Sequence, residues 1–471
     1  MSILNKRTVL SVTLGVAAFA TFGMLNSVSA QTLESALVLS YQNNPSLNAQ
    51  RAALRAIDEN VPIALSGYRP KITGTLTGGA TNQDQISKVV SGTGVSTYTT
   101  SNDNIAPHSY GVTATQTLYN GNQTANRTRQ AEGQVSAGRE TLRLTEQTIL
   151  LNAATAYMNL LRDSAILDLQ RRNVEVLQEQ LRQTRDRFNV GEVTKTDVAQ
   201  AESRVAAGRS SMLGAESNVV TSRATYRQVV GTEPGKLSAG TPVDRLSPRT
   251  LNTAVQQGRV ENPSVTAAAL GVDVAGFQVK INEGALYPTV TVSAGANYSA
   301  EQTTAVVKTM SYAALGTISV PLYQGGAEYA TIRQSKETLG QRRMDLDTQR
   351  DTAQQSVVQS WGQLEAAKAQ IIATQAQVSA AETALNGVRE EARVGQRTTL
   401  DVLNAQQELV NARVAQVSAQ RDRVVASYSL LSATGRLSVK ALNLKVGTYD
   451  SMVHYQQVRD TWVGVRTPDG R

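Results

Sequence analysis

Apolar residues recur at every seventh position over two long segments of this chain, residues 121–190 and 325–394. The first set is Leu160, Leu167, Val174, Leu181 and Phe188, and the second is Leu364, Ile371, Val378, Leu385 and Ala392. A seven-residue repeat keeps apolar side chains on one face of an α-helix and is typical of coiled-coil packing. The pattern therefore predicts two helices of about seventy residues, each roughly 105 Å long at ~1.5 Å per residue.

Shorter helical patterns lie before and after the long ones. The seven-residue spacing continues over residues 195–231 and 399–435, which we expect to be return helices. Residues 33–67 and 251–286 also carry helical patterns, and Asn44-Pro45 interrupts the first of them because the residue before a proline avoids helical geometry.

A period of two marks four further segments, residues 71–82, 108–119, 289–299 and 310–322. Alternate side chains of a β-strand point to opposite faces, so each segment predicts a strand with one apolar face. About ten residues is the length of a strand that crosses a bilayer, although a soluble half-buried hairpin shows the same alternation. The polar residues between strands, at 82–107 and 299–309, are expected to form exposed loops.

The chain repeats itself. Asn44-Pro45-Ser46 recurs as Asn262-Pro263-Ser264, and Leu118-Tyr119-Asn120-Gly121 recurs as Leu322-Tyr323-Gln324-Gly325. Such self-similarity predicts two copies of one structural unit. The expected division is a first repeat at 31–231, a linker at 232–250, a second repeat at 251–442 and a C-terminal segment at 443–471.

Residues 1–30 have the pattern of a secretory signal peptide. Lys6 and Arg7 precede an apolar run that ends before the small-residue sequence Ser27-Val28-Ser29-Ala30. A membrane anchor is the alternative, but the run is shorter than the ~20 residues that span a bilayer. No comparable run follows Ala30, so we expect no transmembrane helix in the exported chain, which would then enter a membrane only as a closed β-barrel.

Composition excludes several classes of function. Among 471 residues there is no cysteine, and His108 and His454 are the only histidines, so neither a metal site nor a cofactor is expected. Glycine-rich pieces such as Ser91-Gly92-Thr93-Gly94 lack the lysine of a phosphate-binding loop, and no catalytic constellation is present, so we do not expect an enzyme. The net charge of +8 is mild, and export argues against a nucleic-acid partner.

Two related motifs stand where a long helix ends and a return helix begins. They are Val190-Gly191-Glu192-Val193-Thr194-Lys195-Thr196-Asp197-Val198 and Val394-Gly395-Gln396-Arg397-Thr398-Thr399-Leu400-Asp401-Val402. Glycine can adopt the positive φ that ends a helix, and threonine or aspartate can cap the next one. We therefore expect two hairpin tips in which Asp197 and Asp401 at least act as first-turn acids and Arg397 is at least a solvated charge.

The signal peptide, the duplicated halves and the two tip motifs together resemble the TolC family of outer-membrane efflux and secretion ducts. The resemblance implies an α+β membrane protein: a homotrimer whose chains each give four strands to a twelve-stranded β-barrel joined to a periplasmic α-helical barrel. It implies a passive exit duct, in the outer membrane of a Gram-negative bacterium, of a tripartite efflux pump or type I secretion system. The implied partners are outer-membrane lipid, a periplasmic membrane-fusion adaptor and, through it, an inner-membrane RND, ABC or MFS transporter.

The same resemblance assigns roles at the tips. It implies that Arg397 holds the periplasmic end closed with Thr196 and Asp197 as partners, and that Asp401 is an acid of the pore constriction. Asn404 replaces the second aspartate of many relatives. Adaptor contacts are implied for Val190, Gly191, Val394 and Gly395.

A secreted coiled-coil scaffold or adhesin with a small soluble strand domain is the alternative function. The alternating strand face separates the two, because only a channel would cover it with lipid or detergent. The sequence does not name the exported substrate.

Overall fold

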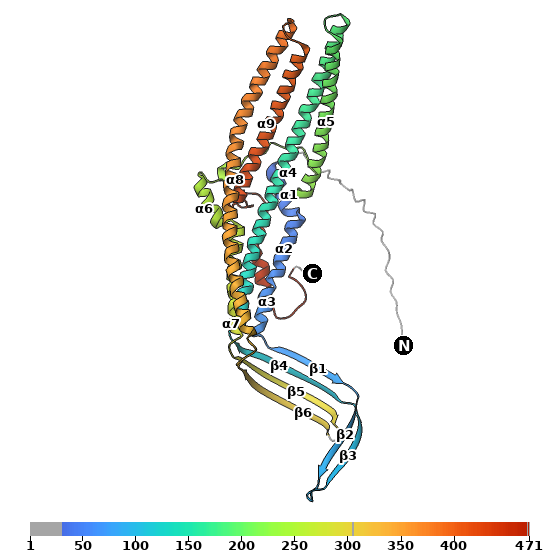
Figure 1. The fold of residues 1–471 in the computed structure, drawn as a ribbon, viewed down its shortest axis with the longest axis vertical. Coiled ribbons are helices and arrows are strands. Elements are labelled where there is room, and N and C mark those ends of the chain that lie inside the picture. The colour runs from blue at the N-terminus through green and yellow to red at the C-terminus, as the bar shows by residue number, and fades with distance from the viewer. Residues whose placement is uncertain (1–30, 304–305, 469, 471) are drawn as a thin grey trace, which may run out of the picture.

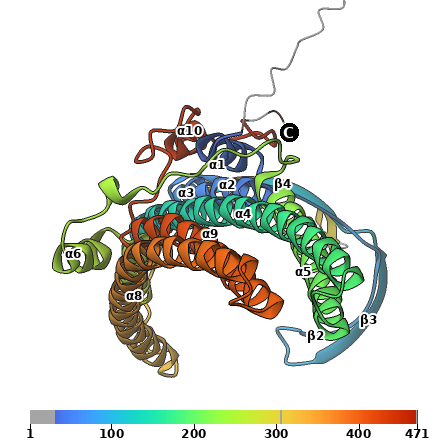
Figure 2. The same cartoon turned by 90° about the horizontal axis from the view of Figure 1, so that it is seen from above.

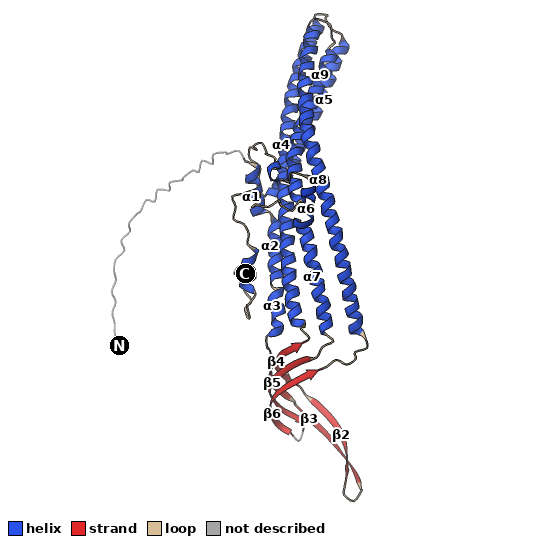
Figure 3. Cartoon of the chain, turned by 90° about the vertical axis from the view of Figure 1, so that its left-hand side faces the viewer, coloured by secondary structure: helices blue, strands red, loops and turns tan. Residues whose placement is uncertain are grey.

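The computed structural model describes residues 31–303, 306–468 and 470, so the expected signal peptide at 1–30 lies outside the described residues. The helices form a long rod, and all strands gather at one end of it (Figure 1, Figure 3). Seen along the rod, the long helices form an arc with one concave and one convex side (Figure 2).

Two helical hairpins run the length of the rod. The long helices α4 (Gln123–Asn189) and α8 (Ala327–Arg393) have 67 residues each, and they pair with the return helices α5 (Lys195–Val230) and α9 (Thr399–Ala433). The side chains of the seven-residue series pack between the helices, and Val174 and Leu385 are buried there. Phe188 departs from the pattern with 43 % of its surface exposed, because it lies in the last turn of α4, where the two hairpins have separated (Figure 1).

The helical segments before the strands, expected within residues 33–67 and 251–286, are each divided into shorter helices. The elements are α1 (Leu33–Asn43), α2 (Pro45–Asp58), α3 (Asn60–Leu65) and a 3₁₀ turn (Ser66–Tyr68), then α6 (Leu251–Glu261) and α7 (Pro263–Gly284). Asn44 and Asn262 cause equivalent breaks. Each adopts extended geometry before its proline and caps the following helix, and its amide donates to a carbonyl at the end of a return helix, Val229 or Ala433, at 3.0 Å.

One segment after residue 30, which the sequence interpretation did not identify, is long and apolar enough to cross a membrane by length and composition alone. Leu251–Gly284 spans 34 residues with a mean hydropathy of 1.2 in its most apolar window. The break at Asn262-Pro263 conceals this length in the sequence. Because α7 packs along α4 and α8, it belongs to the rod, but only 22 % of the window is buried within one chain.

Four strands form one antiparallel sheet in the order β1-β4-β5-β6. Their bounds are β1 (Lys71–Gly78), β4 (His108–Asn120), β5 (Thr289–Thr303) and β6 (Val306–Ser319). The segments 82–107 and 299–309 are not the expected loops: β2 (Thr81–Val90) and β3 (Ser96–Ile105) pair over ten positions as a separate hairpin, and β5 and β6 extend into the second segment. Threonine, valine and tyrosine favour strands even where both faces are exposed, and such strands lack the apolar alternation that predicts them.

The main core lies at the waist of the rod. Tyr157, Tyr226 and Tyr428 are buried there among leucines of α1, α4 and α9. The linker after α5, with a 3₁₀ turn at Asp244–Leu246, and the chain after α9 cover this core. The last helix, α10 (Ser451–Val458), lies on the convex side with α1, α2 and α3 (Figure 2).

Candidate functional site

The first tip is a tight, capped turn between α4 and α5. Gly191 has a φ of +82°, a conformation that residues with a Cβ rarely adopt. Thr194 and Asp197 then cap α5 reciprocally: the Thr194 hydroxyl accepts from the Asp197 amide, and an Asp197 carboxylate oxygen accepts from the Thr194 amide at 2.9 Å. The hydrogen bonds from Thr194 hold the pKa of Asp197 below its usual value.

The second tip repeats this geometry. Gly395 also has a φ of +82°, and Thr398 and Asp401 form the same reciprocal cap, with 3.0 Å from the Thr398 amide to the Asp401 carboxylate. Hydrogen bonds from Thr398 lower the pKa of Asp401, with a smaller contribution from the Arg397 charge. Both acids therefore have at least the first-turn capping role that the sequence allows.

Arg397 is engaged within its own hairpin. Its Nε donates to a carboxylate oxygen of Glu391 at 2.8 Å, which raises the pKa of Arg397. The partners expected from the resemblance, Thr196 and Asp197, lie on the other tip, and the two tips stand apart in the single chain (Figure 1). The structure thus brings Asp197 to Thr194 and Asp401 to Thr398, but it does not bring Arg397 to the first tip.

Glu391 is a partner that the sequence interpretation missed. The first tip has the opposite arrangement, since Arg187 on the helix faces Glu192 in the turn with 3.4 Å between Nε and a carboxylate oxygen. Arg187 and Glu391 occupy equivalent helix positions in the two repeats. This reversal of charge at matched positions is the sequence signal from which the pairing of Arg397 with Glu391 could have been predicted.

Leu403, near the start of α9, connects the two hairpins close to the tips. Only 1 % of its surface is exposed, and it packs in a cluster with Leu177, Ala201 and Val205 of the first hairpin. Beside it the Arg204 guanidinium donates to the side-chain oxygen of Asn404 at 2.7 Å. Asn404 therefore forms a hydrogen bond between the two hairpins.

The extreme ends of both tips present apolar surface. Val190 and Val394 are 72 % and 67 % exposed, and a Cβ built on Gly191 or Gly395 would meet nothing within 4 Å. Within the part of the chain that the structure describes, nothing covers these four residues.

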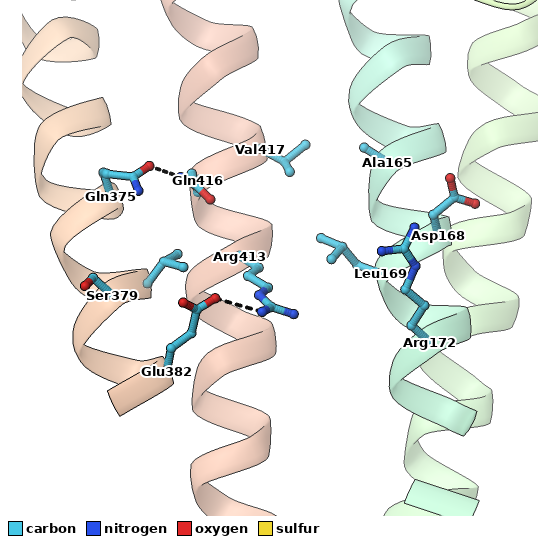
Figure 4. Close-up of a pocket in the computed structure, with 11 residues that line it drawn as sticks. Ala165, Asp168, Leu169, Arg172, Gln375, Ser379, Glu382, Arg413, Gln416 and Val417 are labelled. Carbon is cyan, nitrogen blue, oxygen red and sulfur yellow. Dashed lines mark hydrogen bonds and ion pairs between the residues drawn. The ribbon is translucent and has the colours of Figure 1, made fainter. Parts of the chain in front are cut away.

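An open groove separates the hairpins between the tips and the waist (Figure 4). On one side Arg413 pairs with Glu382 at 2.8 Å and Gln416 bonds to Gln375, and on the other side α4 presents Asp168 and Arg172. Within the described ranges, no group of three or more His, Cys, Asp and Glu residues could hold a metal ion.

The four-stranded sheet has two unlike faces. Directly paired residues point to the same side, and three paired rows on one side are almost entirely apolar. These rows are Ile72-Ala114-Ala294-Ala314, Gly74-Val112-Ala296-Tyr312 and Leu76-Tyr110-Tyr298-Met310. The intervening rows on the other side are Thr73-Thr113-Gly295-Ala313, Thr75-Gly111-Asn297-Ser311 and Thr77-Ser109-Ser299-Thr309. Tyr312 is 72 % exposed, so the apolar face is bare in the single chain.

Comparison with known proteins identifies the relatives of this chain. The family model described as outer membrane efflux protein matches residues 36–232 and 254–436. The outer membrane efflux protein BepC of Brucella suis is 42 % identical over 443 residues, which cover 94 % of this chain and 93 % of BepC. The outer membrane protein TolC of Escherichia coli is 27 % identical over 317 residues, 64 % of each chain.

A solved structure shows the same fold. The Campylobacter jejuni CmeC outer membrane channel superposes with a TM-score of 0.75 over 91 % of this chain and 89 % of its own, at 14 % sequence identity. The resemblance to the TolC family is therefore confirmed, and the relatives are channel proteins rather than enzymes. The chain belongs to the outer membrane efflux protein family, the ducts of efflux and type I secretion systems that lie in the Gram-negative outer membrane and extend into the periplasm.

Proposed function

We propose that three copies of this chain form a passive, gated exit duct, with four strands from each copy closing a twelve-stranded barrel and the helices forming the periplasmic tube. The two-faced sheet carries this proposal. Its apolar rows suit contact with lipid, and its threonine and serine rows suit a water-filled lumen.

The edges of the sheet support closure by further copies. β1 and β6 are the first and last strands of the sheet order, and backbone groups at an open edge cannot be satisfied in lipid. A strand from a neighbouring copy at each edge satisfies them. The arc of long helices in Figure 2 and the partly open apolar surface of α7 suit the same assembly.

The tips are the proposed meeting point with the rest of the export machinery. Val190, Gly191, Val394 and Gly395 form the bare apolar end that a periplasmic adaptor would contact, and the adaptor would connect the duct to an RND, ABC or MFS transporter in the inner membrane. We propose that the chain has no enzymatic activity and that the inner-membrane partner supplies the energy for export; among the described residues, no group of acidic or histidine side chains could hold a metal ion.

The gate is proposed to close between copies rather than within one. Arg397 would exchange its local partner Glu391 for Thr196 and Asp197 of a neighbouring tip, and an arginine fork is suited to both acceptors. Asp401 would place one carboxylate per chain at the constriction. Its lowered pKa keeps it ionised at neutral pH.

The assembly and the channel are tested together by extraction and electrophysiology. The full chain, extracted from membranes in detergent, is expected to have the mass of a trimer by light scattering and to conduct ions in planar bilayers. A protein that remains soluble and monomeric without detergent would overturn the proposal in favour of the scaffold or adhesin function.

A further inference from the structure

The C-terminal segment is fastened to the convex side of the rod. Nδ1 of His454 lies 3.0 Å from a carboxylate oxygen of Asp58 in α2, and both side chains are buried. The Arg139 guanidinium of α4 lies 5.1 Å from the centre of the Tyr455 ring, and Val458 is buried. α10 therefore has a defined place on the rod rather than a loose attachment.

Beyond α10 the chain reaches the junction between rod and sheet. Arg69 donates to the carbonyl oxygen of Thr461 at 2.7 Å, and its guanidinium lies 4.6 Å from the centre of the Trp462 ring. Arg69 precedes the first residue of β1, Lys71, by two positions. Trp462 is thereby held at the level where the sheet begins.

Residues 461–466, the tail patch, combine exposed apolar side chains with basic neighbours. Trp462, Val463 and Val465 are 67 %, 87 % and 100 % exposed. Arg69, which contacts Trp462, and Arg466, which belongs to the patch, supply positive charge beside them. Tryptophan with arginine or lysine is the combination that membrane proteins place at the lipid headgroup level, where the ring is partly buried and the cation meets phosphate.

We propose that the tail patch inserts into the headgroup region of the periplasmic leaflet of the outer membrane and anchors each copy to anionic phospholipid. The inference rests on the outer-membrane position of the sheet. Two observations support it. The patch is continuous with the sheet, because Arg69 contacts the patch and leads directly into β1, whose Ile72 belongs to the apolar face. The positive charges of Arg69 and Arg466 would also attract lipid phosphate.

A second copy of the chain is a poorer occupant of this patch. Figure 2 shows α10 and the C-terminal end on the convex side of the arc, while α5 and α8 lie at its two ends. Copies that close a tube meet at the ends of the arc, so neighbouring copies leave the convex side, and with it the tail patch, uncovered.

The two tryptophans of the chain allow a direct test. Trp361 is half-buried against the α6–α8–α9 cluster in the rod, well away from the sheet. In the full-length Trp361→Phe variant, Trp462 is the single emitter. We expect brominated phosphatidylglycerol in reconstituted vesicles to quench most of its fluorescence, and to leave Trp361 in the Trp462→Phe variant almost unquenched.

A reference tryptophan on the sheet distinguishes two outcomes: a tail patch that does not bind lipid, and a sheet that does not lie in the membrane. Tyr312→Trp, placed on the apolar sheet face in a chain with both native tryptophans replaced by phenylalanine, reports whether the sheet lies in lipid. A quenched reference with an unquenched Trp462 would overturn the anchor and leave the channel intact. An unquenched reference would instead count against the membrane position of the sheet.

The charge contribution is tested by changing the lipid and the arginine. Trp462 quenching is expected to fall when brominated phosphatidylcholine replaces phosphatidylglycerol, and to fall in the same way in phosphatidylglycerol for Arg69→Gln. Equal quenching in both lipids would overturn the preference for an anionic headgroup. Trp462 that is quenched by aqueous acrylamide but not by lipid would overturn the anchor, because the ring would then lie in water.

Discussion

The two hairpin tips have the same fold but different chemistry. Each has a glycine with a φ of +82° followed by a reciprocal Thr-Asp cap, Thr194 with Asp197 and Thr398 with Asp401. The ion pair across the turn is reversed, because the arginine stands on the helix in the first tip and in the turn in the second. Both copies therefore share the glycine and the cap that fold the turn, but they differ in the charged side chains that the turn exposes.

The tips also differ in how they connect to the rest of the chain. Leu403 in the second repeat is buried against the first hairpin, whereas the equivalent residue in the first repeat, Ala199, is exposed. Contact between the hairpins near the tips thus depends on α9. The second hairpin therefore supplies the buried leucine of this contact, and the first hairpin has no counterpart of it at Ala199.

The largest expected effect follows from removing this contact. Leu403→Ala leaves a cavity against Leu177 and Val205 and should destabilise the contact between hairpins by about 2–5 kcal/mol. Hydrogen exchange in the first turns of α9 is expected to accelerate strongly. Ala199→Ser is the matched control, and acceleration of equal size in that variant would show that the hairpins are equivalent after all.

Removing a cap should have a smaller effect, of the same size at both tips. Thr194→Ala and Thr398→Ala each lose one hydrogen bond to a first-turn amide, which costs ~1 kcal/mol of local stability. Hydrogen exchange in α5 and α9 measures the two effects separately. A clearly larger effect at one tip would contradict the view that the caps are interchangeable.

Acid should loosen both tips together. The pKa values of Asp197 and Asp401 lie below the usual 3.8 in the folded protein, so their stabilising contribution is complete above that pH and is lost as the pH falls below it. First-turn exchange, corrected for its intrinsic pH dependence, is expected to accelerate below about pH 4. Asp197→Asn and Asp401→Asn should remove this pH response, each at its own tip, and a response that persists would assign it to other groups.

The smallest expected effect concerns the reversed ion pairs and tests the gate. Arg397→Ala should raise single-channel conductance by favouring the open tip, but only by a few-fold at most, since exposed ion pairs stabilise weakly. Arg187→Ala breaks the corresponding pair of the first tip and should leave conductance unchanged. Equal responses from the two variants would remove Arg397 from the gate.

The rod follows closely from the sequence, because helix packing repeats at a fixed spacing. Val174 and Leu385 belong to seven-residue series and are buried as such a spacing requires. The sequence did not predict the hairpin of β2 and β3, because strands exposed on both faces show no alternation of apolar and polar residues. α10 was also missed, since its place depends on a contact between His454 and Asp58, two residues far apart in the sequence.

The tips were predictable in outline and not in their pairings. The position of Gly395 and the spacing of Thr398 and Asp401 indicate a capped turn from local chemistry alone. The pairing of Arg397 with Glu391 depends on how the turn folds back along the helix. The burial of Leu403 depends on the relative height of two separate hairpins, which no single repeat encodes.

The equal length of α4 and α8 constrains how a duct of this kind can evolve. Both helices have 67 residues, and their tips end at the same height in Figure 1. An insertion in one half would raise its tip by ~1.5 Å per residue relative to the other and would carry Leu403 past its partners. The reach of the tube across the periplasm can therefore change only through matched insertions or deletions in both halves of the gene.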